Sequence, residues 1–261
     1  MKDWGKIAEE ISIWIRDYSE RNGIENLVVG VSGGIDSAVA STLSAMTGMR
    51  TIVLNMPIHQ GSSQYELSNL HIEWMMSKWG NVESRELDLS STYDEFCSEL
   101  RDEGVSELSL ANSRARLRMV TLYAIAGSNN GIVVGTGNKV EDFGVGFFTK
   151  YGDGGVDISP IADLFKTEVY SIGEELGILE EIREAPPTDG LWEDGRTDEE
   201  QMGATYEELE WAMKEEENPA ITDPTEREQE VLNIYRTLNA TNSHKMSPIP
   251  VFKLHSVDRG D

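Results

Sequence analysis

The sequence of 261 residues contains a single cysteine, Cys97. One cysteine excludes an internal disulfide and any metal cage made of several thiolates. Cys97 lies in the segment YDEFCSEL, whose apolar spacing is helical, so we expect it to fill space in the core rather than to act as a nucleophile. The chemistry of the protein must therefore come from other residue types.

Basic residues are scarce as well. Lysine and arginine together number 22 against 47 aspartates and glutamates, which gives a formal net charge of −25 at pH 7. A chain this acidic is repelled by nucleic acids and by anionic membrane surfaces, so we expect no nucleic-acid partner. If the ligand carries phosphates, the basic residues around it must be placed there specifically.

Long hydrophobic runs are also missing. No stretch approaches the roughly 20 apolar residues that a membrane-spanning helix needs, so we expect no membrane partner. The N-terminal segment interrupts its apolar positions with acids and lacks the basic start of a signal peptide, which favours a cytoplasmic protein. The length suits one large domain, and we predict a single domain over residues 1–261.

The first half of the sequence alternates short apolar runs with helical patterns. Runs rich in β-branched residues predict strands, and apolar residues at helical spacing predict helices between them. This alternation predicts an α/β fold, in which a parallel sheet carries helices on both faces. We expect strands at 26–31, 50–57, 82–89 and 131–138, and helices at 4–21, 36–47, 62–79, 92–102 and 110–128.

The pattern changes after residue 138. Residues 139–160 are rich in glycine and aromatic residues and show no clean period, which is typical of a functional loop. The tail from residue 242 is predicted to be extended and irregular. Helical spacing returns between these segments, and the resulting C-terminal helices are expected to pack against the sheet at 162–177, 205–217 and 223–238.

The segment VVGVSGGIDSAVAS, residues 28–41, joins the first predicted strand to a helix through a turn of small residues. Backbone N–H groups and the helix dipole attract anions at such a point, and glycines let the backbone approach a phosphate closely. The segment therefore predicts a phosphate-binding loop. It has no lysine, which excludes a Walker A loop, and its glycine spacing does not fit the dinucleotide fingerprint.

Asp36 follows this turn directly and has two possible roles. A carboxylate is favourable in the first turn of any helix, so Asp36 can be an ordinary first-turn acid. Beside a phosphate, however, a carboxylate is repelled unless a cation lies between the two, so Asp36 can equally be a Mg²⁺ ligand. The spacing alone leaves both roles open.

The sequence GVSGGIDS, residues 30–37, resembles the pyrophosphate loop of the N-type ATP pyrophosphatases, which cleave ATP between its α and β phosphates. Further segments resemble the NAD synthetase family of that group, in the same order along the chain. FFTKYGDGG, residues 147–155, is the most specific of them. The matching segments are 111–119 (ANSRARLRM), 135–169 (GTGNKVEDFGVGFFTKYGDGGVDISPIADLFKTEV), 186–192 (PPTDGLW), 196–210 (RTDEEQMGATYEELE) and 243–246 (SHKM).

The resemblance implies a Rossmann-like fold of the adenine nucleotide alpha hydrolase type and a homodimer. It also implies a ligase that makes NAD from deamido-NAD, ATP and ammonia through an adenylated intermediate, with Mg²⁺ as cofactor and ATP as co-substrate. The chain resembles the shorter, ammonia-dependent form of the enzyme, so we expect no glutaminase (nitrilase) domain. Two alternatives stay open: another amide ligase of the group, similar to GMP synthetase, and a non-catalytic ATP-binding module.

The resemblance also implies roles for individual residues. Catalysis is assigned to Asp36 and Lys166, and Mg²⁺ binding to Asp36 and Glu141. Counting forward from Thr136 selects Glu141 as the second metal ligand, whereas counting back from Lys150 selects its neighbour Asp142. The expected ATP-binding residues are Gly30, Val31, Ser32, Gly33, Gly34, Ile35, Asp36, Ser37, Thr136, Lys166 and Thr188, and the expected deamido-NAD-binding residues are Arg116, Lys150, Asp157, His244 and Lys245.

Overall fold

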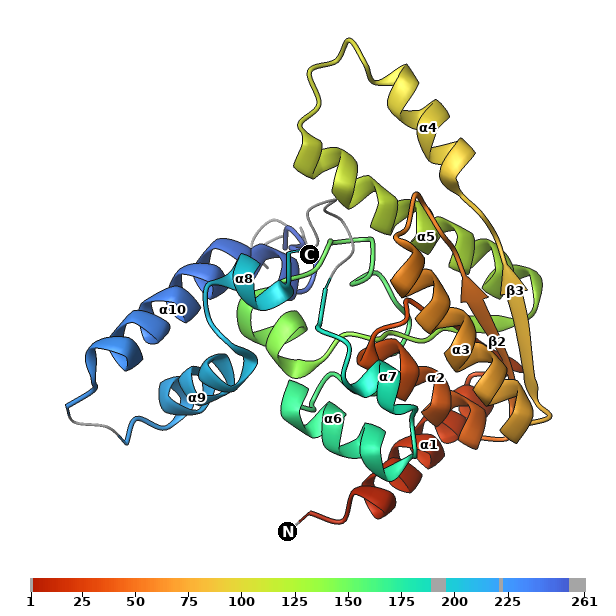
Figure 1. The fold of residues 1–261 in the computed structure, drawn as a ribbon, viewed down its shortest axis with the longest axis horizontal. Coiled ribbons are helices and arrows are strands. Elements are labelled where there is room, and N and C mark those ends of the chain that lie inside the picture. The colour runs from red at the N-terminus through yellow and green to blue at the C-terminus, as the bar shows by residue number, and fades with distance from the viewer. Residues whose placement is uncertain (1, 189–195, 221–222, 254–261) are drawn as a thin grey trace, which may run out of the picture.

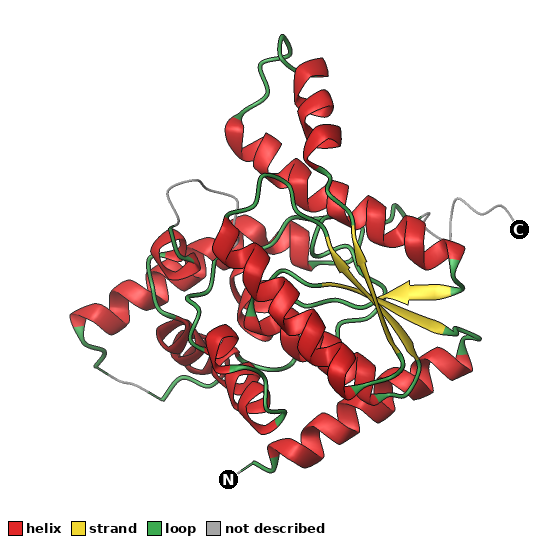
Figure 2. Cartoon of the chain, turned by 45° about the vertical axis from the view of Figure 1, so that its right-hand side comes forward, coloured by secondary structure: helices red, strands yellow, loops and turns green. Residues whose placement is uncertain are grey.

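The computed structural model describes residues 2–188, 196–220 and 223–253, and in them a parallel sheet occupies the centre (Figure 2). The sheet has four strands in the order β3-β2-β1-β4, and β1 and β2 are its inner strands. Side chains of β1 are buried on both faces of the sheet, which is why this strand reads as a continuous apolar run. The strands are β1 (Asn26–Gly30), β2 (Arg50–Asn55), β3 (Val82–Glu86) and β4 (Gly131–Val133).

The predicted α/β fold with helices on both faces is confirmed. Leu27 and Val29 of β1 face one side of the sheet and pack in a cluster with the helices α1, α2 and α6, whereas Val28 faces the other side and packs with α5. This alternation follows the two-residue period of a strand. The helices that flank the sheet are α1 (Trp4–Arg21), α2 (Ile35–Met46), α3 (Ser62–Lys78), α5 (Glu107–Ser128), α6 (Lys166–Glu175) and α7 (Glu180–Arg183).

A second helical layer lies to one side of the sheet (Figure 1). Its own apolar cluster includes Val140, Leu209 and Leu232, one from each of three segments, so the layer has a core separate from that of the sheet. The segments of the layer are the π-helix η1 (Val140–Val145), α8 (Asp198–Met202), α9 (Tyr206–Glu217) and α10 (Glu226–Met246). The predicted packing of C-terminal helices on the sheet is confirmed through α6, which belongs to the sheet's cluster, and α9 and α10 pack beside it with η1.

The end of α10 differs from the sequence-based expectation, because the helix continues to Met246 where an extended tail was predicted. The side chains of Asn239 and Asn242 donate hydrogen bonds to the carbonyls of Gly144 and Val145 in η1. Polar contacts rather than apolar burial thus hold this end of the helix. A prediction that relies on apolar periodicity does not detect such contacts.

Four smaller expectations were also wrong. Residues 139–160 contain η1, and two short helices, α7 and α8, lie where a loop was expected. The helix expected from residue 162 begins at Lys166, because Phe165 has an extended backbone and its N–H is capped by Glu168. Cys97 lies on α4 (Ser90–Glu99) and is partly exposed rather than buried.

In the part of the chain that the structure describes, no helix has the length and apolar composition needed to cross a bilayer.

His71 of α3 is fully buried against the phosphate-loop helix α2. Its Nε2 lies 3.0 Å from the Oγ of Ser41, and its ring stacks on Trp74 with 5.4 Å between ring centroids. Within the described residues, Nδ1 of His71 has no hydrogen-bond partner. A second proton on the ring would give the imidazole a positive charge in the core. Burial therefore lowers the pKa of His71 from 6.5 to about 4.

This burial predicts a loss of stability in acid. The unfolded chain protonates His71 below pH 6.5 but the folded chain only below about pH 4, so the free energy of unfolding falls as the pH drops through this window. The shift corresponds to about 3 kcal/mol. Chemical denaturation at several pH values should show that a His71→Gln variant, whose amide can still bond Ser41, lacks this component. An equal pH dependence in both proteins would contradict the assignment.

Candidate active site

The candidate site lies at the carboxyl ends of β1 and β4. The chain runs from β1 toward β2 and β3 on one side and returns to β4 on the other, so the strand order reverses between β1 and β4. Parallel α/β sheets bind ligands at such a reversal point. A cavity of about 570 Å³ occupies this place, lined by residues of the phosphate loop, α5, the 134–156 segment, α6 and α10.

The phosphate loop is shaped by hydrogen bonds between its own serines. The backbone N–H of Ser32 donates to the Oγ of Ser37 at 3.1 Å, and that Oγ donates to the carbonyl of Gly34 at 2.9 Å. Gly33 has a φ of +91°, and a Cβ at this position would lie 2.6 Å from the carbonyl oxygen of Gln64 on α3. Glycine is therefore required at position 33, because both the backbone angle and the space exclude a side chain.

Lys166 lies between two carboxylates at the base of the cavity. Its ammonium donates to Asp36 at 2.5 Å and to Glu141 at 3.0 Å, and only 3% of its side chain is exposed. These three residues come from the first turns of α2, η1 and α6. The structure thus brings together the two predicted metal ligands and the predicted catalytic lysine.

Two further side chains hold the carboxylates in place. The amide of Asn138 donates to Asp36 at 3.1 Å, and its Oδ1 accepts from the backbone N–H of Glu141 at 3.1 Å. The hydroxyl of Tyr206 on α9 donates to Oε1 of Glu141 at 2.6 Å. The second of these contacts joins the C-terminal helical layer to the site.

The charges of this group are unequal, since one ammonium faces two carboxylates. Burial alone would lower the pKa of Lys166, but Asp36 and Glu141 outweigh burial and raise it, so the lysine stays charged. Burial also opposes ionisation of Glu141, yet Lys166, Tyr206 and Asn138 together lower its pKa. Burial and the nearby Glu141 raise the pKa of Asp36. One ammonium therefore compensates the two carboxylates only in part.

Two more carboxyl groups line the cavity. Burial, with repulsion from Glu141, Asp153 and Asp36, raises the pKa of Asp142 to about 8, and its carboxylate lies against the backbone of Gly137. Burial raises the pKa of Asp153 to about 6, although its Oδ1 accepts from the backbone N–H of Thr149. Of the two neighbours, Glu141 bonds Lys166, so the geometry favours Glu141 over Asp142 as partner of Asp36.

Basic side chains meet in another part of the cavity lining. Lys150 donates to the carbonyl of His244 at 2.7 Å, and Lys245 donates to the carbonyl of Phe148 at 2.8 Å, so the FFTKYGDGG segment is joined to the end of α10. Arg116 of α5 donates to the carbonyl of Lys150 at 3.2 Å. Four of the five residues expected to bind deamido-NAD are thus assembled from segments far apart in the sequence.

Most of the predicted site residues line the cavity, and two of them do not. Asp157 does not belong to the described lining of the cavity. Its carboxylate instead accepts from the hydroxyl of Tyr123 at 3.0 Å and from the backbone N–H of Val133 at 2.7 Å, so it ties the 134–158 segment to β4 and α5. Gly33 lies behind the lining. The predicted residues in the lining are Gly30, Val31, Ser32, Gly34, Ile35, Asp36, Ser37, Arg116, Thr136, Glu141, Lys150, Lys166, Thr188, His244 and Lys245.

Sequence reasoning missed several residues that shape the site. Asn138 ends a predicted strand and gave no signal of its own. Tyr206, Asp198 and Gln201 lie in the 196–210 segment, which resembled the family as a whole without pointing to single residues. Asp198 and Gln201 line the cavity, and Asp198 Oδ2 lies 3.3 Å from the hydroxyl of Tyr206. Residues 189–192 of the PPTDGLW segment lie outside the described residues.

Comparison with known proteins assigns the chain to a family, because the NAD synthase family matches residues 7–249. The chain belongs to the NAD synthase family. An NH₃-dependent NAD⁺ synthetase of Alkaliphilus metalliredigens is 39% identical over 93% of this chain and 97% of its own length, and one of Methanosarcina acetivorans is 35% identical over 97% and 100%. The structure titled NMN synthetase from Francisella tularensis superposes with a TM-score of 0.86 at 30% identity, over 97% of this chain and 100% of that chain.

These findings confirm the predicted NAD synthetase family, its Rossmann-like fold and its class of carbon–nitrogen ligases. They do not support the two alternatives left open by the sequence, a ligase similar to GMP synthetase and a module without catalysis. The roles of the individual site residues stay predictions.

The donor set of the site fits a magnesium ion bound together with a nucleotide. No group of three or more histidine, cysteine or carboxylate side chains able to hold a metal occurs in residues 2–188, 196–220 and 223–253. Mg²⁺ is commonly held by one or two carboxylates plus phosphate oxygens and water. Asp36 and Glu141 supply two carboxylates beside the phosphate loop, and together they carry one more negative charge than Lys166 offsets, which suits a cation.

The loop geometry predicts different effects for two adjacent glycines. A Gly33→Ala substitution should lower the free energy of unfolding by about 1–3 kcal/mol, since it forces an alanine to a positive φ against Gln64. Gly34→Ala serves as control, because the φ of Gly34 is −88° and its Cβ would meet nothing closer than Ser32 Oγ at 3.5 Å. Urea denaturation measures both, and equal losses would show that the strain argument is wrong.

Proposed function

We propose that the cavity joins ammonia to the nicotinate carboxylate of deamido-NAD, with cleavage of ATP to AMP and pyrophosphate. The observation that carries the proposal is the buried Lys166, paired with Asp36 and Glu141 beside a lysine-free phosphate loop. The volume of about 570 Å³ lies in the range of small-molecule sites.

The chemistry needs two steps because ammonia cannot displace an oxygen from a carboxylate directly. In the first step, an oxygen of the nicotinate carboxylate attacks the α-phosphorus of ATP, and the bond between the α-phosphorus and the bridging oxygen breaks to release pyrophosphate. In the second, ammonia attacks the carbonyl carbon of the resulting mixed anhydride. The nitrogen loses a proton, and AMP leaves with the electron pair of the broken bond.

The first step brings two anions together, and the cations of the site reduce their repulsion. In this proposal the N–H groups at the start of α2 and the hydroxyls of Ser32 and Ser37 hold the β and γ phosphates. Lys166 places a fixed positive charge at the phosphates. Thr136 and Thr188 contact the nucleotide from the ends of their segments. The protein thereby supplies orientation and charge, which is how phosphoryl-transfer enzymes generally act.

Asp36 and Glu141 would hold the Mg²⁺ that accompanies ATP. When bound, this ion supplies positive charge between the carboxylates and the triphosphate. Asp36 and Glu141 carry one more negative charge than Lys166 offsets, so a divalent cation turns the group from repelling to attracting phosphate. Lys166 alone does not make the group attract phosphate, because its single positive charge is exceeded by the two negative charges of Asp36 and Glu141.

Arg116, Lys150, His244 and Lys245 form the proposed deamido-NAD subsite. Their contacts with backbone carbonyls gather three basic side chains in one part of the cavity lining. Asp157 stays a predicted contact of deamido-NAD, although its carboxylate is engaged with Tyr123 and the backbone of Val133. These bonds are equally consistent with Asp157 shaping the segment that follows Lys150.

The similarity to the Francisella protein titled NMN synthetase favours a second candidate substrate, nicotinate mononucleotide. This molecule carries the same carboxylate as deamido-NAD but lacks the adenylate half. Both candidates use the same Asp36, Glu141 and Lys166, so they differ only in what fills the rest of the cavity. Rates with each substrate, measured separately, distinguish them.

We further propose that the chain acts as a homodimer in the cytoplasm and takes ammonia directly. Exposed apolar side chains on α4 and α5 support the homodimer, since Phe96, Leu108 and Val120 are 43%, 56% and 66% exposed. A second copy of the chain would cover them.

Product analysis tests the reaction. Purified protein with ATP, Mg²⁺, deamido-NAD and ammonium should yield NAD, AMP and pyrophosphate, and glutamine in place of ammonium should yield little NAD. ADP in place of AMP would contradict cleavage between the α and β phosphates. Efficient use of glutamine by the homogeneous protein would contradict direct use of ammonia.

An Asp36→Asn substitution tests the role of the carboxylate. It should lower the rate of AMP formation at least a hundredfold, because a neutral amide binds Mg²⁺ poorly and no longer pairs with Lys166. Asp163→Asn is the matched control, since the side chain of Asp163 is 97% exposed and its ion pair is with Lys139. Near wild-type AMP release by Asp36→Asn, with a normal melting temperature, would overturn the assignment.

A further inference from the structure

Tyr206 contacts Glu141 and Lys166 from the side away from the cavity. It is 4% exposed and does not belong to the described lining of the cavity. Its hydroxyl donates to Oε1 of Glu141 at 2.6 Å, and its ring lies beneath Lys166 with 4.7 Å between Nζ and the ring centroid. One side chain therefore touches both the carboxylate and the ammonium on which the proposed chemistry depends.

The backbone of Tyr206 is fixed by contacts on both sides. Its N–H donates to Glu199 at 2.9 Å. One turn later on α9, the buried Glu210 accepts from the backbone N–H of Thr167 at 2.9 Å and from its hydroxyl at 2.8 Å. Thr167 directly follows Lys166, so Glu210 ties α9 to the start of α6. The phenol is thus held at a defined place relative to Lys166.

The hydroxyl of Tyr206 is not needed to fill space in the core. Tyr206 belongs to the apolar cluster of the C-terminal layer, where phenylalanine would occupy the same volume without a polar group to satisfy. Lys166 and Tyr206 both donate to the same oxygen of Glu141, Oε1. Neither of these two donors occupies Oε2. Fixing one oxygen of a carboxylate from behind is the usual way in which an outer residue orients a metal ligand.

We infer that Tyr206 is a positioning residue, which anchors Oε1 of Glu141 through its hydroxyl and thereby directs Oε2 toward the cation that accompanies ATP. This inference rests on the proposed metal role of Asp36 and Glu141. It assigns the C-terminal helical layer a part in the chemistry, since α9 carries Tyr206 to the site and Glu210 keeps α9 there.

The test is metal binding by a Tyr206→Phe variant, which keeps the ring beneath Lys166 and removes only the hydroxyl. The probe is Mn²⁺, titrated by electron paramagnetic resonance in the presence of α,β-methylene-ATP, which cannot be cleaved at the relevant bond. We expect the Kd of Mn²⁺ to rise about 10- to 100-fold, with the melting temperature within a few degrees of wild type. The KM for Mg²⁺-ATP in the full reaction should rise with it.

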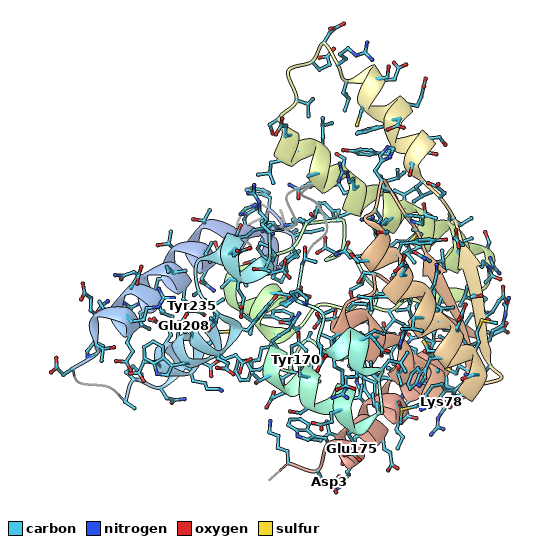
Figure 3. All side chains as sticks on the ribbon, in the orientation of Figure 1. Asp3, Lys78, Tyr170, Glu175, Glu208 and Tyr235 are labelled. Carbon is cyan, nitrogen blue, oxygen red and sulfur yellow. The ribbon has the colours of Figure 1, made fainter. Side chains whose placement is uncertain are left out.

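Tyr235→Phe is the matched control, since Tyr235 packs against the same apolar cluster from α10 (Figure 3). It should leave the Kd unchanged. An unchanged Kd in Tyr206→Phe, beside normal binding in wild type, would overturn this inference and leave the metal site intact. Failure of the wild-type protein to bind Mn²⁺ would instead overturn the proposed metal site, and the inference with it.

A double substitution shows whether Tyr206 acts through Glu141. In a Glu141→Gln background, Tyr206→Phe should change the Kd of Mn²⁺ less than twofold, because the carboxylate that the hydroxyl orients is no longer present. The same fold-change in both backgrounds would show that the hydroxyl acts by another route, and would overturn the inference.

Discussion

The pairing of buried Lys166 with Asp36 and Glu141 is the interaction on which the rest of the structure depends. A charged group in a protein interior is costly unless it has partners of opposite charge and further hydrogen bonds. Lys166 is 3% exposed, so its ammonium requires both carboxylates. Those carboxylates belong to α2 and η1, and the lysine begins α6. Removal of Lys166 leaves two buried carboxylates without their cation, and removal of either carboxylate leaves Lys166 with one ion-pair partner instead of two.

The second helical layer extends this dependence. Asn138 bonds both Asp36 and the start of η1, and Tyr206 bonds Glu141 from α9. The layer has its own apolar cluster, so it is stabilised independently of the sheet, yet it meets the sheet domain at the charged group. Polar contacts are more directional than apolar ones, because a hydrogen bond weakens steeply away from its preferred angle. The site thus adds directional contacts between the helical layer and the sheet to those made by apolar packing.

The sequence predicted the parts of this arrangement that follow from local patterns. The β1 run, the SGG turn and the helix after it obey rules of period and turn chemistry, and the structure confirms the sheet they imply. Contacts made by polar residues from distant segments leave no such pattern. Tyr206 at the start of an amphipathic helix reads as an ordinary core aromatic, and Asn138 as the end of a strand. Glu141 and Asp142 are neighbours in sequence, and only the backbone of η1 decides that Glu141 bonds Lys166 whereas Asp142 lies against Gly137.

The local arrangement of charge also explains how a protein of net charge −25 can attract a triphosphate. At physiological salt the Debye length is about 8 Å, so exposed acids far from the cavity are largely screened from a ligand inside it. The field at the phosphates is set instead by the groups that line the cavity. The basic ones are Lys166, Lys150, Lys245, Arg116 and Arg118, and the acidic ones are Asp36, Glu141, Asp142, Asp153 and Asp198. Burial keeps these charges less screened than surface charges. The acidity of the surface and the affinity of the cavity for anions are therefore separate properties, and a divalent cation held by Asp36 and Glu141 would change only the affinity of the cavity.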